Sequence, residues 1–326
     1  MFDFVQRTFG RTEHELRTRA SSRSQLRGAA HGPTHVSPEL LKQVRLIELK
    51  TRRIVNTLFT GEYRSAFKGH GMDFAEVREY MPGDEVRSID WNVTARMRKA
   101  YIKRYIEERE LTVMLAMDVS GSEEFGTVSR FKSEVLMEFA TLIAMSAVRN
   151  NDRVGMMFFT DEVEYVVPPK KGKRHALRMV RDLLAFKAKG TETNLVPAMQ
   201  QLSQTLRQRT VIFVVSDFVT KGYERALSVL AQRHDVIAVT VNDPGEGTLP
   251  DAGVARLVDP ETGSYIEIDT SSPTVRTAYL DYMTAELAGR RQAFNRMGVD
   301  EIPLSTTRQA IEPLLKFFRS RRMRLR

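Results

Sequence analysis

The sequence predicts an α/β protein built on a doubly wound, mainly parallel sheet, with a small β-rich segment in front of it. Near-continuous apolar runs at 111–118, 211–218 and 236–241 have the composition of strands buried on both faces. Segments with helical periodicity alternate with these runs, as in a parallel sheet connected by helices. The chain before residue 111 lacks this alternation, which indicates a separate N-terminal part.

The N-terminal part divides into two pieces. Residues 1–36 mix Arg, Ser, Thr, Gly and His without periodicity and predict a disordered basic leader. Ser37 and Pro38 have the N-cap and first-turn signature of a helix, for which Gly61 provides a stop. Short runs with aromatic residues and glycine-containing breaks follow, so 37–110 is predicted to hold this helix and the small β-rich segment.

The larger domain is predicted to span 111–318 and to leave a basic tail at 319–326. Its first helix follows the strand at 111–118, and two short strands come next, before further alternating helices and strands. A hairpin around residues 261–263, a long helix, a last strand and a terminal helix complete it. The expected elements are helices at 131–147, 176–183, 196–208, 223–232, 275–297 and 308–318, and strands at 154–159, 164–168, 211–218, 236–241 and 302–306.

Composition excludes several classes of protein. The 326 residues contain no Cys, so disulfides and Cys-ligated zinc are excluded, and no apolar stretch approaches the length that spans a bilayer. The N-terminus lacks the apolar region of a signal peptide, and we therefore expect a cytoplasmic protein. The net charge of +9 belongs to the two ends, since residues 1–36 contribute +3 and residues 316–326 contribute +6.

The strand at 111–118 ends in a cluster of oxygen-bearing side chains: Asp118, Ser120 and Ser122, two residues apart. The carboxyl end of a strand is where ligands bind in an open α/β sheet. One carboxylate and two hydroxyls, without His or Cys, suit a hard cation such as Mg²⁺ or Mn²⁺. Read alone, the D-x-S-x-S spacing is equally typical of a strand end with an Asx turn and a helix cap.

Two further strand-end segments supply oxygen ligands. Asp217 ends the run at 211–218, and Thr193, with Thr191 as its competitor, precedes a helix. Because loops after neighbouring strands converge where the strand order reverses, these residues could surround one cation together with the first cluster. Only two carboxylates would leave the metal electron-poor, so an acidic side chain of a partner would be a favourable further ligand.

The ordered set of Asp118, Ser120, Ser122, Thr193 and Asp217 resembles the metal-ion-dependent adhesion site (MIDAS) of von Willebrand factor A domains. That likeness implies a von Willebrand factor A-like, Rossmann-type fold. The stretches DFAEVREYMPGDEVRSIDWNVTAR, YIKRYIEERE, NDPGEGTLP, DPETGSYIEIDTS and IPLSTT resemble the family called domain of unknown function fifty-eight. The second resemblance covers about residues 60–320 and implies a MoxR-type AAA+ ATPase as partner, in protein remodelling or metalloprotein maturation.

Three functions remain open from the sequence. We expect a non-enzymatic, metal-dependent protein–protein interaction module. The alternating charges around Trp91 predict either a polar interaction surface or a salt-bridge network that fixes the β-rich segment to the neighbouring domain. A metal-dependent phosphohydrolase is the first alternative, although no P-loop and no H-x-x-x-H pair occur. Binding of nucleic acid or an anionic membrane through the basic segments at 170–174 and 316–326 is the second.

Overall fold

The computed structural model describes residues 44–47, 49, 51, 55, 60–67, 73–106, 110–120, 130–258 and 265–324. The predicted leader, most of the predicted helix after Ser37, the predicted turn at 261–263 and Ser122 lie outside these residues.

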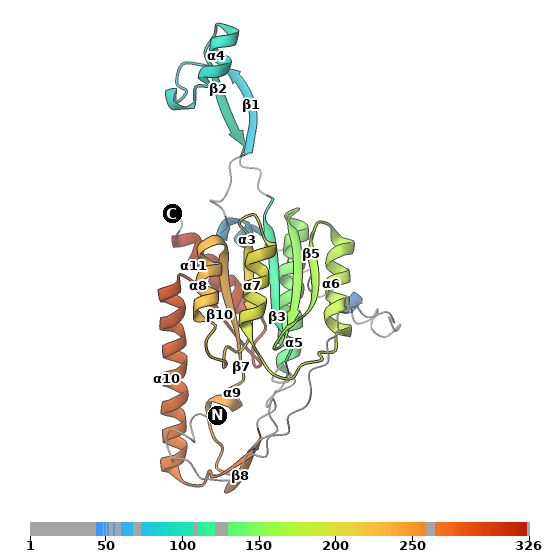
Figure 1. Cartoon of the computed structure of the whole chain (residues 1–326), viewed down its shortest axis with the longest axis vertical. Coiled ribbons are helices and arrows are strands. Elements are labelled where there is room, and N and C mark those ends of the chain that lie inside the picture. The colour runs from blue at the N-terminus through green and yellow to red at the C-terminus, as the bar shows by residue number, and fades with distance from the viewer. Residues whose placement is uncertain are drawn as a thin grey trace.

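The centre of the protein is a six-stranded sheet in the order β10-β7-β6-β3-β4-β5 (Figure 1). Five strands are parallel, and β5 pairs antiparallel with β4 at one edge. The chain runs outward from β3 to β5, then crosses back to β6 and continues to the other edge, so the sheet is doubly wound. The predicted fold class is confirmed. The strands are β3 Thr112–Asp118, β4 Arg153–Phe159, β5 Val163–Lys170, β6 Val211–Val215, β7 Asp235–Asn242 and β10 Asp300–Ser305.

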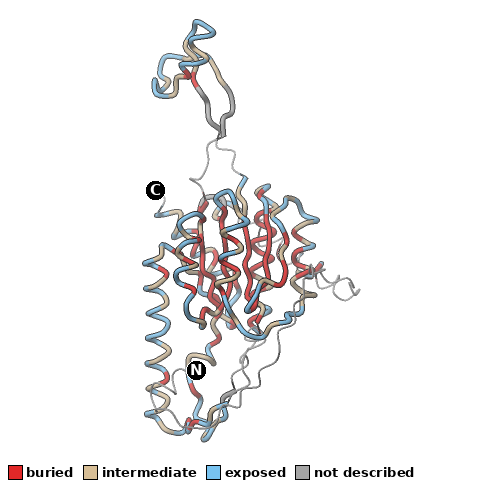
Figure 2. The backbone as a smooth tube through the Cα atoms, viewed as in Figure 1, coloured by how far each residue is buried: buried red, intermediate tan, exposed pale blue. Residues whose placement is uncertain are grey.

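The strands are apolar along their whole length because both faces of the sheet are covered. In β3, Leu115 faces one hydrophobic core and Ala116 faces the other, as the alternation of side chains along a strand requires. The tube in Figure 2 shows the central strands as the most deeply buried part of the chain. The continuous apolar runs in the sequence thus reflect burial on two sides.

Helices form a layer on each face of the sheet. The residues of α3 Thr60–Ala66, α5 Lys132–Arg149, α6 Lys173–Ala185 and α11 Ile311–Arg324 pack into one core. Those of α7 Leu195–Thr205, α8 Glu224–Arg233 and the C-terminal part of α10 Pro273–Met297 pack into the other. No helix of the described residues has both the length and the apolar character that a membrane span requires.

A small subdomain lies beyond the carboxyl ends of the strands. It comprises the short helix α9 Pro244–Gly247, the antiparallel hairpin of β8 Val254–Val258 and β9 Tyr265–Asp269, and the first half of α10. Leu249, Ile268 and Tyr279 form its own small core. The predicted hairpin pairing is therefore present, and it extends the molecule at this edge of the sheet (Figure 1).

The predicted β-rich segment is an arm at the opposite edge. Strands β1 Asp73–Glu79 and β2 Tyr101–Ile106 form an antiparallel ribbon, and the 3-10 helix η2 Val86–Ser88 and α4 Trp91–Met97 lie between them. Because β2 leads into the start of β3, the arm leaves the body at the amino ends of the parallel strands (Figure 1). Two ion pairs, Arg78–Asp84 and Lys99–Glu79, join residues within the arm.

The last helix is longer than predicted. We expected a helix at 308–318 and a basic tail at 319–326, but α11 continues to Arg324. Its arginines pair with acidic residues of the body, which favours continued helix over a solvated tail. Arg321 contacts Asp235 and Asp300, Arg324 contacts Asp300, and Arg319 and Arg322 contact Glu62.

Candidate metal centre

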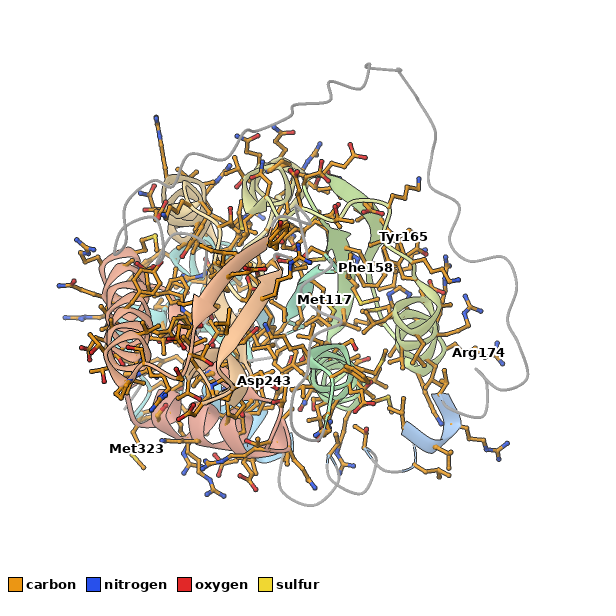
Figure 3. All side chains as sticks on the ribbon, turned by 90° about the horizontal axis from the view of Figure 1, so that it is seen from below. Met117, Phe158, Tyr165, Arg174, Asp243 and Met323 are labelled. Carbon is orange, nitrogen blue, oxygen red and sulfur yellow. The ribbon has the colours of Figure 1, made fainter. Side chains whose placement is uncertain are left out.

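The candidate site lies at the carboxyl ends of β3 and β6, which are neighbours in the sheet. In the sheet, β4 lies on one side of β3 and β6 lies on the other, so the direction in which the chain adds strands reverses at β3. Crevices at such a reversal are the usual ligand sites of open α/β sheets. Figure 3 looks onto this edge from below, with the β8–β9 hairpin in the foreground and Asp243 labelled beside it.

Asp118 is the most buried acidic residue of the site, with no exposed surface. Its Oδ1 accepts a hydrogen bond from the backbone N–H of Ser120 (3.0 Å), and its Oδ2 accepts one from the Ser216 hydroxyl (2.8 Å). Burial raises the pKa of Asp118 to about 6, and the nearby Asp217 carboxylate adds to the rise, while the hydrogen bonds oppose it. A cation beside Asp118 would relieve both unfavourable contributions.

The hydroxyls of Ser120 and Thr193 meet next to this carboxylate. Thr193 Oγ1 donates to Ser120 Oγ over 2.8 Å, although the two residues are 73 positions apart in the chain. Thr191, the competing candidate, is exposed, whereas Thr193 is half-buried. The structure thus brings Thr193 to the D-x-S-x-S segment. Ser122, the third residue of that segment, is outside the described residues.

The loop that carries Thr193 is held by a buried carboxylate. Glu164 in β5 accepts hydrogen bonds from the backbone N–H groups of Lys189 and Gly190 and from the Thr160 hydroxyl. The backbone N–H of Asn194 in turn donates to the Thr160 carbonyl over 2.9 Å. These bonds fix the backbone on both sides of Thr193, so Glu164 acts as a positioning residue for the site.

Gly190→Ala should disturb this loop. A Cβ atom at Gly190 would lie 2.5 Å from Asp161 Oδ1 and even closer to Thr160 Oγ1. The loop or these two side chains must therefore shift, which disturbs the hydrogen bonds around Glu164. We expect a loss of about 1–3 kcal/mol in the free energy of unfolding, measured in urea. Gly289→Ala is the matched control, because a Cβ there meets nothing within 4 Å in α10 and helix propensity should add up to about 1 kcal/mol. Equal stability of the two variants would contradict this interpretation of the loop.

Asp217 lies on the other side of the site and shares it with a buried lysine. The Lys132 ammonium is 3.9 Å from Asp217 Oδ2 and 2.7 Å from Glu246 Oε1, and only 1% of the lysine side chain is exposed. Arg290 also reaches this strand end and donates to the Asp217 carbonyl over 2.7 Å. Part of the negative charge of Asp217 is therefore offset within the protein itself.

The segment after β7 closes this side of the edge. Asp243 and Glu246 form a capping box on α9, and the Thr306 hydroxyl donates to Asp243 Oδ2 over 2.7 Å. The Tyr279 hydroxyl donates to the Glu246 carbonyl over 2.7 Å. Glu246 thus connects Lys132, at the site, to α10 and the hairpin subdomain.

The donor set suits a hard divalent cation. The described residues contain no cluster of three or more His, Cys, Asp or Glu side chains with metal-binding geometry. They offer the carboxylates of Asp118 and Asp217, which are close enough for Asp217 to raise the pKa of Asp118. Beside them lie the hydroxyls of Ser120 and Thr193, which are hydrogen-bonded to each other. Oxygen ligands of this kind, completed by water, are those that Mg²⁺ and Mn²⁺ accept.

Comparison with known proteins identifies the family. Residues 76–289, which are 214 of the 326, match the family model described as "Protein of unknown function DUF58". The chain belongs to the DUF58 family. The resemblance predicted from the sequence is confirmed.

The DUF58 chain also resembles curated proteins. It is 29% identical over 288 residues to the uncharacterized protein Rv1480 of Mycobacterium tuberculosis, covering 87% of this chain and 90% of that protein. It is 27% identical over 114 residues to the uncharacterized protein YeaD of Bacillus subtilis, covering 35% and 26%. Among solved structures, BatB from Bacteroides thetaiotaomicron has a TM-score of 0.41 at 14% identity, covering 65% of this chain and 98% of that chain. The SpRpn10 VWA domain has a TM-score of 0.35 at 12% identity, covering 64% and 94%.

Three residues of the site in this DUF58 chain were not predicted from the sequence: Ser216, Lys132 and Glu164. Ser216 directly precedes Asp217, and its place within the apolar run 211–218 was a signal that its hydroxyl has a buried partner. Lys132 lies three residues before Val135 and four before Leu136, so its position on the apolar face of α5 could have marked it as buried. Glu164 carries no comparable signal, since an acidic residue in an edge strand is ordinarily exposed.

Proposed function

We propose that this DUF58 protein is a non-enzymatic, divalent-metal-dependent protein–protein interaction module. Asp118, Ser120, Ser122, Thr193 and Asp217 would hold Mg²⁺ or Mn²⁺, and the metal would accept an acidic side chain of the partner. The observation that carries the proposal is the meeting of Asp118, Ser120 and Thr193 at the reversal of strand order, with Asp217 close enough to raise the pKa of Asp118.

The charges around the site favour an acidic partner. Two carboxylates balance the charge of a divalent cation, but the Lys132 ammonium lies 3.9 Å from Asp217 and adds a positive charge. Glu246 contacts the same ammonium at 2.7 Å and offsets that charge in part. A metal held among neutral hydroxyls in this surrounding would gain from one more carboxylate, which the partner would supply.

The absence of a catalytic role is part of the proposal. The histidines among the described residues are His175 and His234, and both lie near the amino ends of the parallel strands, away from Asp118. In this proposal the two carboxylates of the site, Asp118 and Asp217, hold the metal and do not act as general bases toward water. The family resemblance makes a MoxR-type AAA+ ATPase the first partner to test.

The test compares two threonines of one loop. We expect Thr193→Ala to weaken Mn²⁺ binding by about 10-fold or more, because it removes a hydroxyl at the candidate centre. Thr191→Ala makes the same change at a threonine that is exposed to solvent, so this variant should bind Mn²⁺ as the wild type does. Isothermal titration calorimetry with Mn²⁺ measures both.

Binding of the partner should depend on the bound metal. In a pull-down of a MoxR-type ATPase with Mg²⁺ present, Thr193→Ala should lose binding and Thr191→Ala should keep it, and EDTA should release the wild type. Wild-type protein that binds no Mn²⁺ would overturn the proposal. Metal binding that is weakened equally by both variants would argue for a site elsewhere on this loop.

A further inference from the structure

A lysine is buried at the candidate metal centre, which is an unusual place for a cation. Only 1% of the Lys132 side chain is exposed, although a lysine ordinarily keeps its ammonium in water. Lys132 is also the first residue of α5, where the partial positive charge of the helix N-terminus makes another cation unfavourable. Acidic groups near the ammonium must therefore offset both costs.

Two carboxylates from different parts of the fold contact this ammonium. Lys132 Nζ lies 2.7 Å from Glu246 Oε1 and 3.9 Å from Asp217 Oδ2. Asp217 follows β6, whereas Glu246 belongs to α9. The closer contact is thus with the acid that is not a candidate ligand, so Asp217 could bind a metal while Lys132 stays paired with Glu246.

Glu246 is held in its place by the hairpin subdomain. In the capping box of α9, Glu246 Oε2 accepts a hydrogen bond from the backbone N–H of Asp243 over 3.2 Å. The Glu246 carbonyl accepts from the Tyr279 hydroxyl over 2.7 Å. Figure 1 shows α9 between the sheet and the β8–β9 hairpin. These bonds do not involve Asp217, so they would keep Glu246 beside Lys132 when Asp217 binds a metal.

We propose that Lys132 and Glu246 set the metal affinity of the centre, an inference that rests on the proposed function. Lys132 lowers the affinity, because its ammonium lies close to Asp217 and repels a divalent cation bound there. Glu246 limits this effect, because its carboxylate offsets the charge of the ammonium. Both residues act through their charge, and neither is a ligand of the metal.

Lys132→Met should bind Mn²⁺ more tightly than the wild type does. Methionine keeps an unbranched side chain and removes the ammonium, so the repulsion disappears while Asp217 and Glu246 keep their charges. We expect the Kd for Mn²⁺ to fall by about tenfold or more, measured by isothermal titration calorimetry on the full chain. In EDTA the same variant should unfold at a lower temperature, because two carboxylates lose their buried counter-cation.

Glu246→Gln should have the opposite effect on the metal. Glutamine can replace glutamate in a capping box, so α9 keeps its first turn and only the charge is removed. The Lys132 ammonium is then less offset, and the Kd for Mn²⁺ should rise by about threefold or more. A purely structural ion pair predicts weaker Mn²⁺ binding in both variants, so changes of opposite sign identify an effect of charge.

Lys173→Met is the matched control for the loss of a lysine charge. Lys173 is exposed at the start of α6, which follows the end of β5 at the amino edge of the parallel strands. The length of a strand separates it from the centre, which exceeds the Debye length of about 8 Å at physiological ionic strength. Its Kd for Mn²⁺ should equal that of the wild type. Circular dichroism establishes that each variant is folded.

The outcomes separate this inference from the proposed function. If the wild type binds Mn²⁺, a Kd that does not fall in Lys132→Met or does not rise in Glu246→Gln would overturn the inference and leave the metal centre in place. Absence of Mn²⁺ binding in the wild type and in both variants would overturn the inference and the proposed function together. Should Lys132→Met fail to fold, the Kd of Glu246→Gln decides, because that substitution keeps the capping box.

Discussion

Asp118→Asn is expected to abolish the stabilisation of the protein by Mg²⁺ or Mn²⁺ while leaving the metal-free protein at least as stable as the wild type. Asparagine keeps an oxygen that can accept from the Ser120 N–H, and its amide can donate to Ser216 in place of the present bond. What it removes is the anionic ligand at the centre of the candidate site.

The gain in metal-free stability follows from the environment of Asp118. Burial, with the help of Asp217, raises the pKa of its carboxyl from 3.8 to about 6. Since one pKa unit corresponds to about 1.4 kcal/mol, ionised Asp118 costs the metal-free fold on the order of 3 kcal/mol at neutral pH. In the wild type, a cation at a concentration 100 times its Kd should contribute about 2.7 kcal/mol.

Thermal unfolding with EDTA and then with Mn²⁺ measures both effects. Asp152→Asn is the matched control, because burial also raises the pKa of Asp152 to about 6 and its Oδ1 likewise accepts from a backbone N–H, that of Leu111. Asp152 lies at the amino edge of the sheet, so its variant should keep the response to Mn²⁺. An Asp118→Asn protein that is stabilised by Mn²⁺ as strongly as the wild type would exclude the proposed centre.

Phe213→Ala is expected to lower the free energy of unfolding by about 3–5 kcal/mol, the usual cost of removing a fully buried phenylalanine. Phe213 is in the middle of β6 and has no exposed surface. Its ring makes edge contacts with Phe139 of α5, with centroids 5.6 Å apart, and with Phe67 after α3, at 6.3 Å. The truncation therefore leaves a cavity where two helices meet the sheet.

Urea unfolding gives the size of this effect. The loss should take up a large part of the stability of a typical domain, about 5–15 kcal/mol. Phe131→Ala is the control, because Phe131 is 53% exposed at the start of α5 and its truncation should change stability by less than about 0.5 kcal/mol. A loss below about 1 kcal/mol for Phe213→Ala would mean that the core collapses around the gap.

The fold was predictable because strands that are buried on both faces of the sheet appear in the sequence as continuous apolar runs. The runs that became β3, β6 and β7 are apolar at nearly every position, and the helices between them keep their periodicity. Strand ends were equally visible, since Asp118 and Asp217 interrupt or terminate apolar runs. The choice between Thr191 and Thr193 was not, because loop geometry decides which hydroxyl reaches Ser120.

Long-range polar pairs account for what the sequence could not predict. Glu164 holds the backbone at residues 189 and 190, and Lys132 meets Glu246 across the site. Neither pairing has a fixed spacing, because each joins elements that are far apart in the sequence: Glu164 lies in β5, Lys132 in α5 and Glu246 in α9. The length of α11 was missed for the same reason, since the acids that pair with its arginines lie far away in the chain.

Strand β3 has a mechanical consequence for a protein that is held at both ends. The arm continues from its amino end and Asp118 stands at its carboxyl end. A pull between the arm and a partner at the site would load β3 along its length, against hydrogen bonds to β4 on one side and β6 on the other. In this shear geometry the bonds of both ladders share the force, so the sheet would transmit tension between the two ends without unzipping.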